Sequence, residues 1–314
     1  MTRAELDDLA ARLAAAGLPV EREAKMAELT TYHVGGPIDV LVRVGAGAAL
    51  RVLAEAYASS APLLVVGRGS NLLVADAGFP GLGVVLEGEF ERLDLDAEHG
   101  RVRAGASVPL PVLARRSAAA GLTGLEFFVG IPGSVGGAVR MNAGGHGRET
   151  ADVIVEAEVV DLAGGGVATP RRREALGLGY RRSNLAPTEI VTAAVFATTV
   201  GDPATAEATV AEIVRWRREH QPGGANAGSV FANPPGDSAG RLIDSLGLKG
   251  LRVGGAVVSP KHANFFQAEA GATADDVRRL VLEVQRRVFD ATGITLEPEL
   301  RMIGFVDAAG SQPR

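Results

Sequence analysis

The sequence predicts a mixed α+β fold with more than one domain, and three observations lead to this prediction. Segments with helical and strand periodicity follow one another without the regular strand–helix–strand alternation of a parallel α/β sheet. The 314 residues exceed the usual size of a single hydrophobic core, so two or three domains are expected. Glycine contributes 41 residues without a collagen-like period, which indicates many tight turns and backbone that approaches a ligand closely.

The first third of the chain alternates short helices with short strands. Residues 4–16 carry leucines three and four positions apart on one helical face, and Gly17 and Pro19 end this helix. Pro109 suits the first turn of a helix that runs to about Ala120. Between these helices the pattern predicts strands at 38–44, 63–66 and 84–86, a helix at 48–57, and the two arms of a meander at 90–95 and 101–104.

The composition changes between Leu122 and Gly147. Glycines alternate there with small residues, no amphipathic period survives, and a loop of this length inside a compact region is normally functional. The best predicted domain boundary is Gln-Pro-Gly-Gly at 221–224. The remaining predicted elements are strands at 153–162, 190–200, 253–258, 264–267 and 294–303, and helices at 205–220, 238–246 and 275–292.

The composition also excludes several classes of function. With 32 basic and 37 acidic residues the net charge is −5, so no bulk attraction to nucleic acid or to an anionic membrane is expected. The absence of cysteine excludes disulfides, thiolate nucleophiles and iron–sulfur clusters, and no histidine pair has metal-ligand spacing. The start of the chain lacks a signal peptide's basic and apolar regions, and no uncharged stretch is long enough to span a bilayer. We therefore expect a cytoplasmic protein without a metal site.

The first motif that could carry chemistry is the loop Gly67-Arg-Gly-Ser-Asn71, which follows a buried strand. Its two glycines let backbone N–H groups converge on an anion, and the hydroxyl and the amide add donors. The dinucleotide fingerprint would need a further glycine at Leu72, so a Rossmann fold is not indicated. Taken alone, the motif fits an ordinary tight turn equally well.

The second motif is the glycine-rich block 130–145. So many positions without side chains have little use in a core, and they suit backbone that lies against a flat ligand or a pyrophosphate. A glycine-rich packing crossover is the alternative. The other candidate groups are Tyr180-Arg181, Ser229, the pair Glu297 and Glu299 on one strand face, and His262. Each of the first three has a structural alternative: Tyr180-Arg181 could lie on a solvated face, Ser229 could be an ordinary loop serine, and the two glutamates could be an exposed pair.

Together and in this order, six motifs resemble the MurB family, the flavin-dependent UDP-N-acetylenolpyruvoylglucosamine reductases of peptidoglycan precursor synthesis. The resemblance extends over roughly residues 25 to 304, and within the family the chain resembles the shorter, type II members. The motifs are Thr31-Tyr-His-Val-Gly-Gly36, GRGSNLL from Gly67, PGSVGGAVRMNAG from Pro132, Tyr180-Arg181, GSVFANP from Gly228, and PELR from Pro298.

The resemblance implies an FAD-binding module of two subdomains, of the PCMH or vanillyl-alcohol-oxidase type, and a C-terminal α+β domain that closes over the substrate. The expected boundaries are residues 1–81 and 82–220 for the two FAD-binding subdomains and 221–314 for the substrate domain. It implies a UDP-N-acetylmuramate dehydrogenase that serves cell-wall biogenesis, and with it cell shape, cell division and the cell cycle.

The resemblance also implies roles for individual residues. Arg181, Ser229 and Glu299 are the implied catalytic residues. The implied cofactor-binding residues are Tyr32, Val34, Gly67, Arg68, Gly69, Ser70, Asn71, Leu72, Gly130, Ile131, Pro132, Gly133, Ser134, Gly136, Gly137, Asn142, Ala143, Gly144 and Ile190, and the implied substrate-binding residues are Tyr180, Asn233, Lys261 and His262.

In the implied reaction NADPH, as co-substrate, reduces noncovalently bound FAD, and the enolpyruvyl ether of the UDP-sugar then accepts the hydride. Arg181 would stabilise the negative charge on the substrate carboxylate, Glu299 would help as a protonated acid, and Ser229 would protonate C2. We also expect Gly69→Val to weaken FAD binding far more than the fold.

Three positions depart from the family's usual pattern. The family commonly has Lys where His220 and Ala232 stand, and often Tyr at His146. The first two leave open which cation holds the substrate's phosphates, and Arg252 or Lys261 could do so. The alternative functions are another FAD oxidoreductase of the same superfamily, acting on a hydroxy acid or an alcohol, and a flavin-binding module without turnover.

Overall fold

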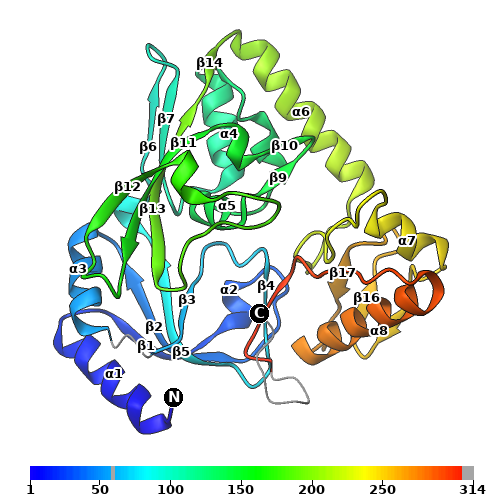
Figure 1. Ribbon diagram of the computed structural model, residues 1–314, viewed down its shortest axis with the longest axis horizontal. Coiled ribbons are helices and arrows are strands. Elements are labelled where there is room, and N and C mark those ends of the chain that lie inside the picture. Colours follow the sequence, from blue (N-terminus) through cyan, green and yellow to red (C-terminus); the bar gives the residue numbers. More distant parts are fainter. Residues whose placement is uncertain (58–60, 306–314) are drawn as a thin grey trace. The chain divides into compact units, whose positions relative to one another are not determined.

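The computed structural model describes residues 1–57 and 61–305 and divides them into two compact units, each built from separate stretches of the chain (Figure 1). Unit 1 consists of residues 1–22, 39–68 and 81–217, and unit 2 of residues 23–38, 69–80 and 218–314, of which 306–314 are not described. The finer division into three domains stays a prediction.

Unit 1 contains most of a four-stranded sheet with the order β1-β2-β5-β3. Its strands β3 and β5 run parallel. The helices α1 and α3 contact each other and bury their leucines in the core of the unit. The bounds are α1 Arg3–Ala15, β1 Val20–Lys25, β2 Pro37–Val44, α3 Gly47–Ala56, β3 Leu63–Val65 and β5 Phe79–Leu86.

The second sheet of unit 1 is antiparallel and has the order β12-β11-β13-β7-β6, and these strands lie side by side in Figure 1. Helix α5 packs against β13 and β7. The bounds are η1 Gly88–Glu91, β6 Leu93–Asp96, β7 Arg101–Gly105, α4 Leu110–Ala119, β8 Leu122–Thr123, η2 Glu126–Gly130, α5 Val135–Met141, β9 Gly144–Gly145, β10 Arg148–Glu149, η3 Thr150–Asp152, β11 Ile154–Asp161, β12 Ala168–Arg172, η4 Arg173–Leu176, β13 Glu189–Ala197, β14 Thr199–Val200 and α6 Pro203–His220.

Unit 2 has its own hydrophobic core, in which the long helix α8 covers the antiparallel meander β15-β16-β17. Segments from early in the chain complete this core, because Tyr32, Val34 and Leu73 are buried in it. Strand β4 pairs in parallel with the last strand, β18. The bounds are α2 Met26–Leu29, β4 Leu72–Val74, α7 Ala239–Ser245, β15 Arg252–Val253, β16 Ala256–Val258, β17 Phe266–Ala268, α8 Ala274–Thr292 and β18 Arg301–Ile303.

The structure differs from the sequence prediction in several segments, including the glycine-rich block, the last strand and the start of α4. The stretch 122–147 is not one long loop, because it contains the short helix α5 and two small hairpin strands. The last strand is confined to Arg301–Ile303, while residues 294–300 are largely irregular and pair only locally. Pro109 is the residue before α4 and not its first turn.

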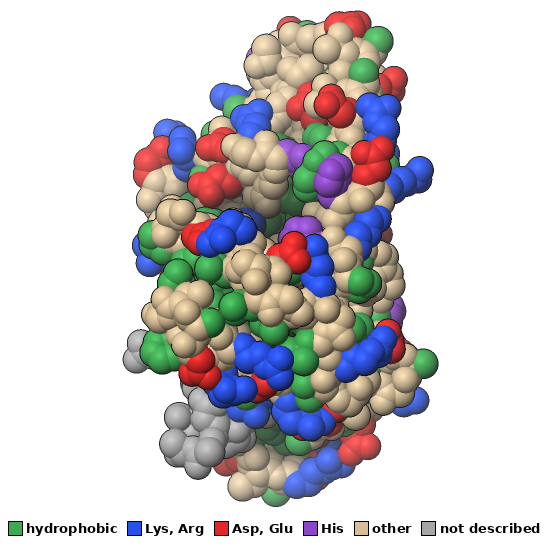
Figure 2. Space-filling view, turned by 90° about the vertical axis from the view of Figure 1, so that its right-hand side faces the viewer, with side chains coloured by type: hydrophobic (Ala, Val, Ile, Leu, Met, Phe, Trp, Pro, Cys, Tyr) green, Lys and Arg blue, Asp and Glu red, His purple; other side chains and the backbone are tan. Residues whose placement is uncertain are grey.

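The surface fits the charge balance of the sequence. On the face in Figure 2, basic and acidic side chains are mixed, with hydrophobic side chains between them. Among the described residues, no helix is both long and apolar enough to cross a membrane, and no group of three or more His, Asp or Glu side chains could hold a metal ion.

Candidate active site

A small cavity of about 100 Å³ in unit 1 is lined by the glycines that the sequence singled out. It lies where strand β3 ends, at the start of α5 and beside strand β13. The predicted cofactor residues on its wall are Gly67, Ser134, Gly136, Gly137 and Ile190. Ser134 is buried, and its Oγ lies 2.6 Å from where a Cβ on Gly67 would stand, so even a methyl group there would crowd the wall. This wall therefore presents backbone and small polar groups, as a flat, diphosphate-bearing cofactor requires.

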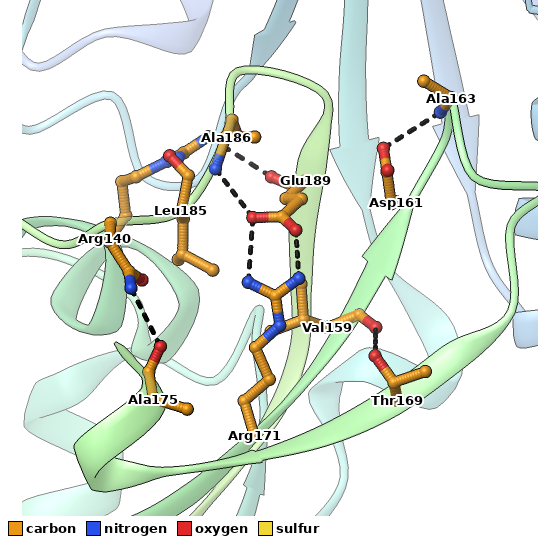
Figure 3. Close-up of polar contacts among 11 residues, drawn as sticks. Arg140, Val159, Asp161, Ala163, Thr169, Arg171, Ala175, Leu185, Ala186 and Glu189 are labelled. Atoms are coloured by element: carbon orange, nitrogen blue, oxygen red, sulfur yellow. Dashed lines mark hydrogen bonds and ion pairs between the residues drawn. The ribbon is translucent and has the colours of Figure 1, made fainter. Parts of the chain in front are cut away.

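Arg140 and Glu189 also line the cavity, and the sequence analysis did not single them out. Figure 3 shows Arg140 beside the loop that leads into β13, where its guanidinium donates to the carbonyls of Leu185 (2.6 Å) and Ala186 (3.0 Å). Glu189 is buried and pairs with Arg171 through both carboxylate oxygens. Arg140 is the one charged residue of the glycine-rich block 130–145, and this isolated charge is the sequence feature that could have marked it as a site residue.

The rest of the glycine-rich block leads into and out of helix α5. Gly130 ends the helix η2, and Ile131, Pro132 and Gly133 connect it to Ser134, the residue before α5. The carbonyl of Gly133 accepts from Leu110 N–H at 3.0 Å. After α5, Asn142 adopts a left-handed conformation with φ +42°, and Ala143 and Gly144 follow it.

Arg181 lies on a tight turn of unit 1 in a strained backbone conformation. Residues 179–182 are closed by two backbone hydrogen bonds of 3.1 Å, and Arg181 has a φ of +52°, which few non-glycine residues adopt. Its guanidinium lies 5.2 Å from the ring centre of Tyr180, which is 56% exposed, and donates to the carbonyl of Gly144 at 3.4 Å. Strain of this kind is common at functional sites. The turn therefore presents a cation beside the end of the glycine-rich block.

Ser229 and Glu299 lie in unit 2 on neighbouring backbone segments. Glu299 N–H donates to the carbonyl of Val230 at 2.8 Å, and Phe231 bridges to Pro298. On its other side Ser229 pairs with Phe265 in a further bridge. The structure thus brings a hydroxyl and a carboxylate that are 70 residues apart in the sequence onto one small ladder.

The continuation of the first motif lies in unit 2. Gly69 has a φ of +61°, and a Cβ there would stand 2.0 Å from the carbonyl oxygen of Leu29 and 2.6 Å from Cα of Thr30. Backbone atoms cannot move aside as a side chain can, so glycine is needed here for packing within the protein. The expectation that Gly69→Val would weaken FAD binding far more than the fold is therefore wrong. Arg68, the last residue of its unit 1 segment, is exposed, and Ser70 and Leu72 are half-buried.

Three consecutive hydroxyls before this loop have no hydrogen-bond partner within the described part of the chain. They are Thr30 Oγ1, Thr31 Oγ1 and the hydroxyl of Tyr32, and all three atoms are buried. Burial raises the pKa of Tyr32 far above its usual value, so its hydroxyl is a neutral donor. Buried polar atoms normally have partners, so unpaired ones at this point fit a bound group that supplies them. Val34 is buried in the core of unit 2 and offers only apolar contact.

The predicted substrate-binding residues of unit 2 lie around the Ser229 ladder. Asn233 Oδ1 accepts from Ala239 N–H at 3.0 Å and so helps to cap α7. Lys261 Nζ donates to the carbonyl of Arg218. His262 Nδ1 accepts from Asn264 N–H at 3.2 Å, and burial, followed by Lys249, lowers the pKa of its imidazole.

The candidate cation Arg252 and two of the positions that depart from the family pattern, Ala232 and His146, have contacts within the protein. Arg252 forms a bidentate pair with Glu269, with N–O distances of 2.5 and 2.9 Å, so its charge is already matched. Ala232 offers only its backbone, which donates to Glu297. His146 packs edge-on against Trp216, with ring centres 5.1 Å apart.

Comparison with family models covers both parts of the chain. A model of an FAD binding domain matches residues 39–169. A model described as the C-terminal domain of UDP-N-acetylenolpyruvoylglucosamine reductase matches residues 220–303. The predicted α+β fold, with an FAD-binding part and a separate C-terminal domain, is confirmed.

The chain is also similar over most of its length to individual proteins. It is 43% identical over 292 residues to the UDP-N-acetylenolpyruvoylglucosamine reductase of Synechococcus sp. (strain WH7803), a match that covers 91% of this chain and 94% of the relative. It is 44% identical over 285 residues to that of Paramagnetospirillum magneticum, with 90% and 91% covered.

Among solved structures, the chain is similar to the crystal structure of UDP-N-acetylenolpyruvylglucosamine reductase (MurB) from Thermus caldophilus, with a TM-score of 0.78 and 40% identity. That match covers 91% of this chain and 99% of the other. On this evidence the chain belongs to the MurB family of FAD-dependent UDP-N-acetylenolpyruvoylglucosamine reductases.

Proposed function

We propose that this protein reduces UDP-N-acetylglucosamine enolpyruvate to UDP-N-acetylmuramate with FAD and NADPH, in the synthesis of peptidoglycan precursors. The observation that carries the proposal is the ladder of unit 2, which places Ser229 and Glu299 on adjacent backbone segments. Reduction of an enolpyruvyl group needs a proton donor and an acid that polarises its carboxylate. Family membership supplies the substrate class. NADPH and UDP-sugars are cytoplasmic metabolites, so we place the reaction in the cytoplasm.

When bound, FAD would supply the hydride chemistry between NADPH and the enolpyruvyl group. The residues proposed to hold it in unit 1 are those of the glycine-walled cavity, with Gly67 and Gly136 among them. In unit 2 the proposed contacts come from the unpaired hydroxyls of residues 30–32 and from the loop at Ser70. These assignments rest on open backbone surface and on buried donors that have no other partner among the described residues.

Three side chains carry the substrate chemistry. Arg181 stabilises the negative charge that develops on the substrate carboxylate, because a fixed cation lowers the energy of that state. Ser229 delivers the proton to C2, and Glu299 polarises the carboxylate. A serine hydroxyl is a weak acid, so the surrounding groups must assist its proton transfer. Lys261, His262, Asn233 and Tyr180 are proposed to bind the UDP-sugar.

The activity is tested with the purified protein, NADPH and the enolpyruvyl sugar, by following NADPH absorbance. We expect NADPH oxidation that requires the sugar and yields UDP-N-acetylmuramate. Oxidation of a hydroxy acid or an alcohol instead would indicate another flavin oxidoreductase. Flavin binding without turnover on any of these substrates would indicate a binding module.

The protein is expected to be yellow and to hold FAD noncovalently, because the chain has no cysteine for attachment and the family does not attach FAD to histidine. Acid precipitation should then release the flavin into the supernatant. Flavin that stays on the pellet, or a colourless protein that cannot be loaded with FAD, would contradict this expectation.

Ser229→Ala separates the two halves of the reaction. Flavin reduction by NADPH needs no proton on substrate carbon, so its rate should stay near wild type. Reoxidation by the enolpyruvyl sugar should slow by about 10²- to 10⁴-fold, the usual contribution of general acid catalysis. Stopped-flow absorbance of the flavin measures both rates, and binding of the sugar should change little.

The matched control is Ser245→Ala, which removes a hydroxyl at the end of α7 that donates to the carbonyl of Leu242. It should leave both rates unchanged. Equal slowing of both halves in Ser229→Ala would mean that Ser229 shapes the site and does not donate the proton. An unchanged reoxidation rate would remove Ser229 from the mechanism.

A further inference from the structure

Asparagine is rare in this chain, and three of its side chains bond to the backbone of the segments that carry the proposed catalytic residues. The sequence contains six asparagines among 314 residues. Asn71, Asn142 and Asn264 each donate an amide N–H to a backbone carbonyl, at 2.8 to 3.0 Å. Each of these carbonyls belongs to a segment that carries one of the three catalytic residues.

We infer that these three asparagines are positioning residues, one for each catalytic residue. Asn142 holds the turn of Arg181, Asn264 holds the strand of Ser229, and Asn71 holds the backbone of Glu299. The inference takes the identity of the catalytic residues from the proposed function. The positioning role of the asparagines rests on the geometry of their amides.

Asn142 has the most complete geometry. Its side chain is fully buried, Nδ2 donates to the carbonyl of Gly179 at 3.0 Å, and Oδ1 accepts from Ala151 N–H at 2.8 Å. Both polar ends of the side chain are therefore used within the protein. The bond to Gly179 anchors the turn that holds Arg181 at its positive φ. A turn strained in this way keeps its shape only when the surroundings fix it.

Helix α5 connects this anchor to the cavity of unit 1. Gly136 and Gly137 near its start line the cavity, and Asn142 caps its end. Near the same end the carbonyl of Arg140 accepts from Ser183 Oγ at 2.8 Å, a second bond to the segment after the turn. A helix of only seven residues thus sets the place of Arg181 relative to the cavity wall.

Asn264 acts on the strand of Ser229. It is 4% exposed, Oδ1 accepts from Phe231 N–H at 3.0 Å, and Nδ2 donates to the carbonyl of Phe231 at 2.8 Å. Its own carbonyl accepts from Val230 N–H at 2.9 Å. The side-chain amide of Asn264 therefore makes with the Phe231 backbone the two hydrogen bonds that a neighbouring strand residue would make, just after Ser229. Such a pair fixes the direction in which the neighbouring side chain points.

Asn71 acts on Glu299 directly. Its Nδ2 donates to the carbonyl of Glu299 at 3.0 Å, and its own carbonyl accepts from Arg301 N–H at 3.1 Å. The Glu299 peptide is thus held on both sides, because its N–H donates to Val230. The prediction that Asn71 and Asn142 contact FAD stays a prediction, but their side-chain amides already serve catalytic segments.

The test compares Asn71→Ala, Asn142→Gly and Asn264→Ala with the control Asn184→Ala. Asn184 donates to the carbonyl of Ala175 at 3.0 Å, outside the turn 179–182, so its loss removes a similar bond from the same unit. Asn142→Gly is the decisive variant, because glycine tolerates the left-handed conformation of Asn142 and keeps the helix end intact. Each protein is loaded with FAD and measured by stopped flow and by hydrogen exchange with mass spectrometry.

We expect flavin reduction by NADPH to stay near the wild-type rate in Asn264→Ala and Asn184→Ala, and to slow less than reoxidation in Asn71→Ala and Asn142→Gly, whose residues are also predicted to contact FAD. Reoxidation by the enolpyruvyl sugar should slow by roughly 10- to 100-fold in the first three, as misplacement of a catalytic group by about 1 Å typically does. It should be unchanged in Asn184→Ala. Amide exchange should accelerate in the held segment, at 229–231 in Asn264→Ala, at 299–301 in Asn71→Ala, and at 179–182 in Asn142→Gly, where Ala151 N–H also loses its acceptor.

The inference is overturned if Asn142→Gly reoxidises at the wild-type rate, or if it slows both half-reactions equally. It is also overturned if exchange at 179–182 does not change. If the wild type does not use the sugar, the proposed function falls, and the exchange measurement still decides whether the amides hold these segments.

Discussion

Gly67 and Gly69 are two positions apart in one loop, but only Gly69 is required for the fold. A Cβ on Gly69 would collide with the backbone of Leu29, and its φ is +61°. A Cβ on Gly67 would meet only the Oγ of Ser134, which can rotate away, and Gly67 is not among the residues with positive φ. A glycine in a sequence does not show whether it is needed for packing within the protein or for open space at a cavity wall, because both depend on contacts with distant residues.

Gly69→Ala and Gly67→Ala should therefore differ. Gly69→Ala should destabilise the FAD-free protein by at least about 1–2 kcal/mol, the usual cost of a left-handed backbone for a residue with a Cβ. Gly67→Ala should leave that stability within about 0.5 kcal/mol. It should weaken FAD binding by roughly tenfold or more, because it crowds the cavity wall. Urea unfolding and a flavin fluorescence titration measure the two effects, and equal stability of both variants would contradict the contact assigned to Gly69.

His262 should titrate below the ordinary histidine range. Burial lowers the pKa of its imidazole most, Lys249 adds to this, and the backbone bond and Asp244 only partly oppose it. The unfolded imidazole takes up its proton near pH 6.5, before the folded one does. The stability that His262 contributes is thus present above about pH 6.5 and is lost as the pH falls through the folded pKa.

An NMR titration should give a midpoint below 6.5 for His262. In His262→Gln, the loss of stability between pH 7.5 and 5.5 should be smaller than in the wild type. A midpoint at or above 6.5 would mean that the imidazole is not desolvated as the structure shows.

At the scale of elements, helix α8 is capped by a residue from the early part of the chain. Its own cap is Thr273, whose hydroxyl accepts from Asp276 N–H at 3.0 Å. Asp76 adds its two carboxylate oxygens, which accept from the N–H groups of Ala274 and Asp275, both at 2.9 Å. A carboxylate at this end also interacts favourably with the helix dipole.

Asp76→Ala should destabilise unit 2 by about 0.5–2 kcal/mol, the usual cost of a lost helix cap. The control is Asp290→Ala, which removes an exposed carboxylate near the other end of the same helix and should change little. Urea unfolding followed by far-UV circular dichroism measures both. Equal effects would show that the bonds of Asp76 add no stability.

The long amphipathic helices could be predicted from the sequence because their periodicity is local. Helix α8 was expected at 275–292 and lies at Ala274–Thr292. Helix α5 was missed, because two adjacent glycines disfavour a helix and only its packing against β13 and β7 compensates. Strand β4 was missed because three residues carry no readable period, and its partner β18 lies more than 220 residues later.

The site was predicted from motif order and family resemblance, and its supporting contacts were not. Asn264 follows Lys261 and His262, which were singled out, but Asn264 was not, because nothing local shows that its amide pairs with Phe231. Asn233 was expected at the substrate, and the structure shows in addition that it caps α7. Contacts of this kind join distant positions, so they follow from the fold and not from a single sequence.

At the scale of the whole molecule, neither unit is a continuous piece of chain. The core of unit 2 requires Tyr32, Val34 and Leu73, and its last strand pairs with β4. A cut at the start of the C-terminal segment therefore deprives that segment of core residues and of its partner strand β4. The predicted boundary at 221–224 lies close to the start of the C-terminal segment of unit 2 at Arg218, and the core contacts of the early segments predict that this segment is not stable alone.

Residues 218–314 expressed alone should show no cooperative thermal transition, because the fragment lacks β4 and part of its core. Mixing with residues 1–217 should restore the transition, since that fragment carries the missing segments. Circular dichroism during heating measures both samples. A cooperative transition in the isolated fragment would show that the early segments contribute little to unit 2.

The interrupted course of the chain also fixes an order of events on the ribosome. Residues 69–80 leave the ribosome long before β18 has been made, and at ordinary rates of synthesis they wait on the order of ten to forty seconds for it. During this time apolar side chains such as Leu73 have no core to enter, and a chaperone can bind them. The loop that continues at Gly69 belongs to this waiting segment, so it takes its final form only when the last strand arrives.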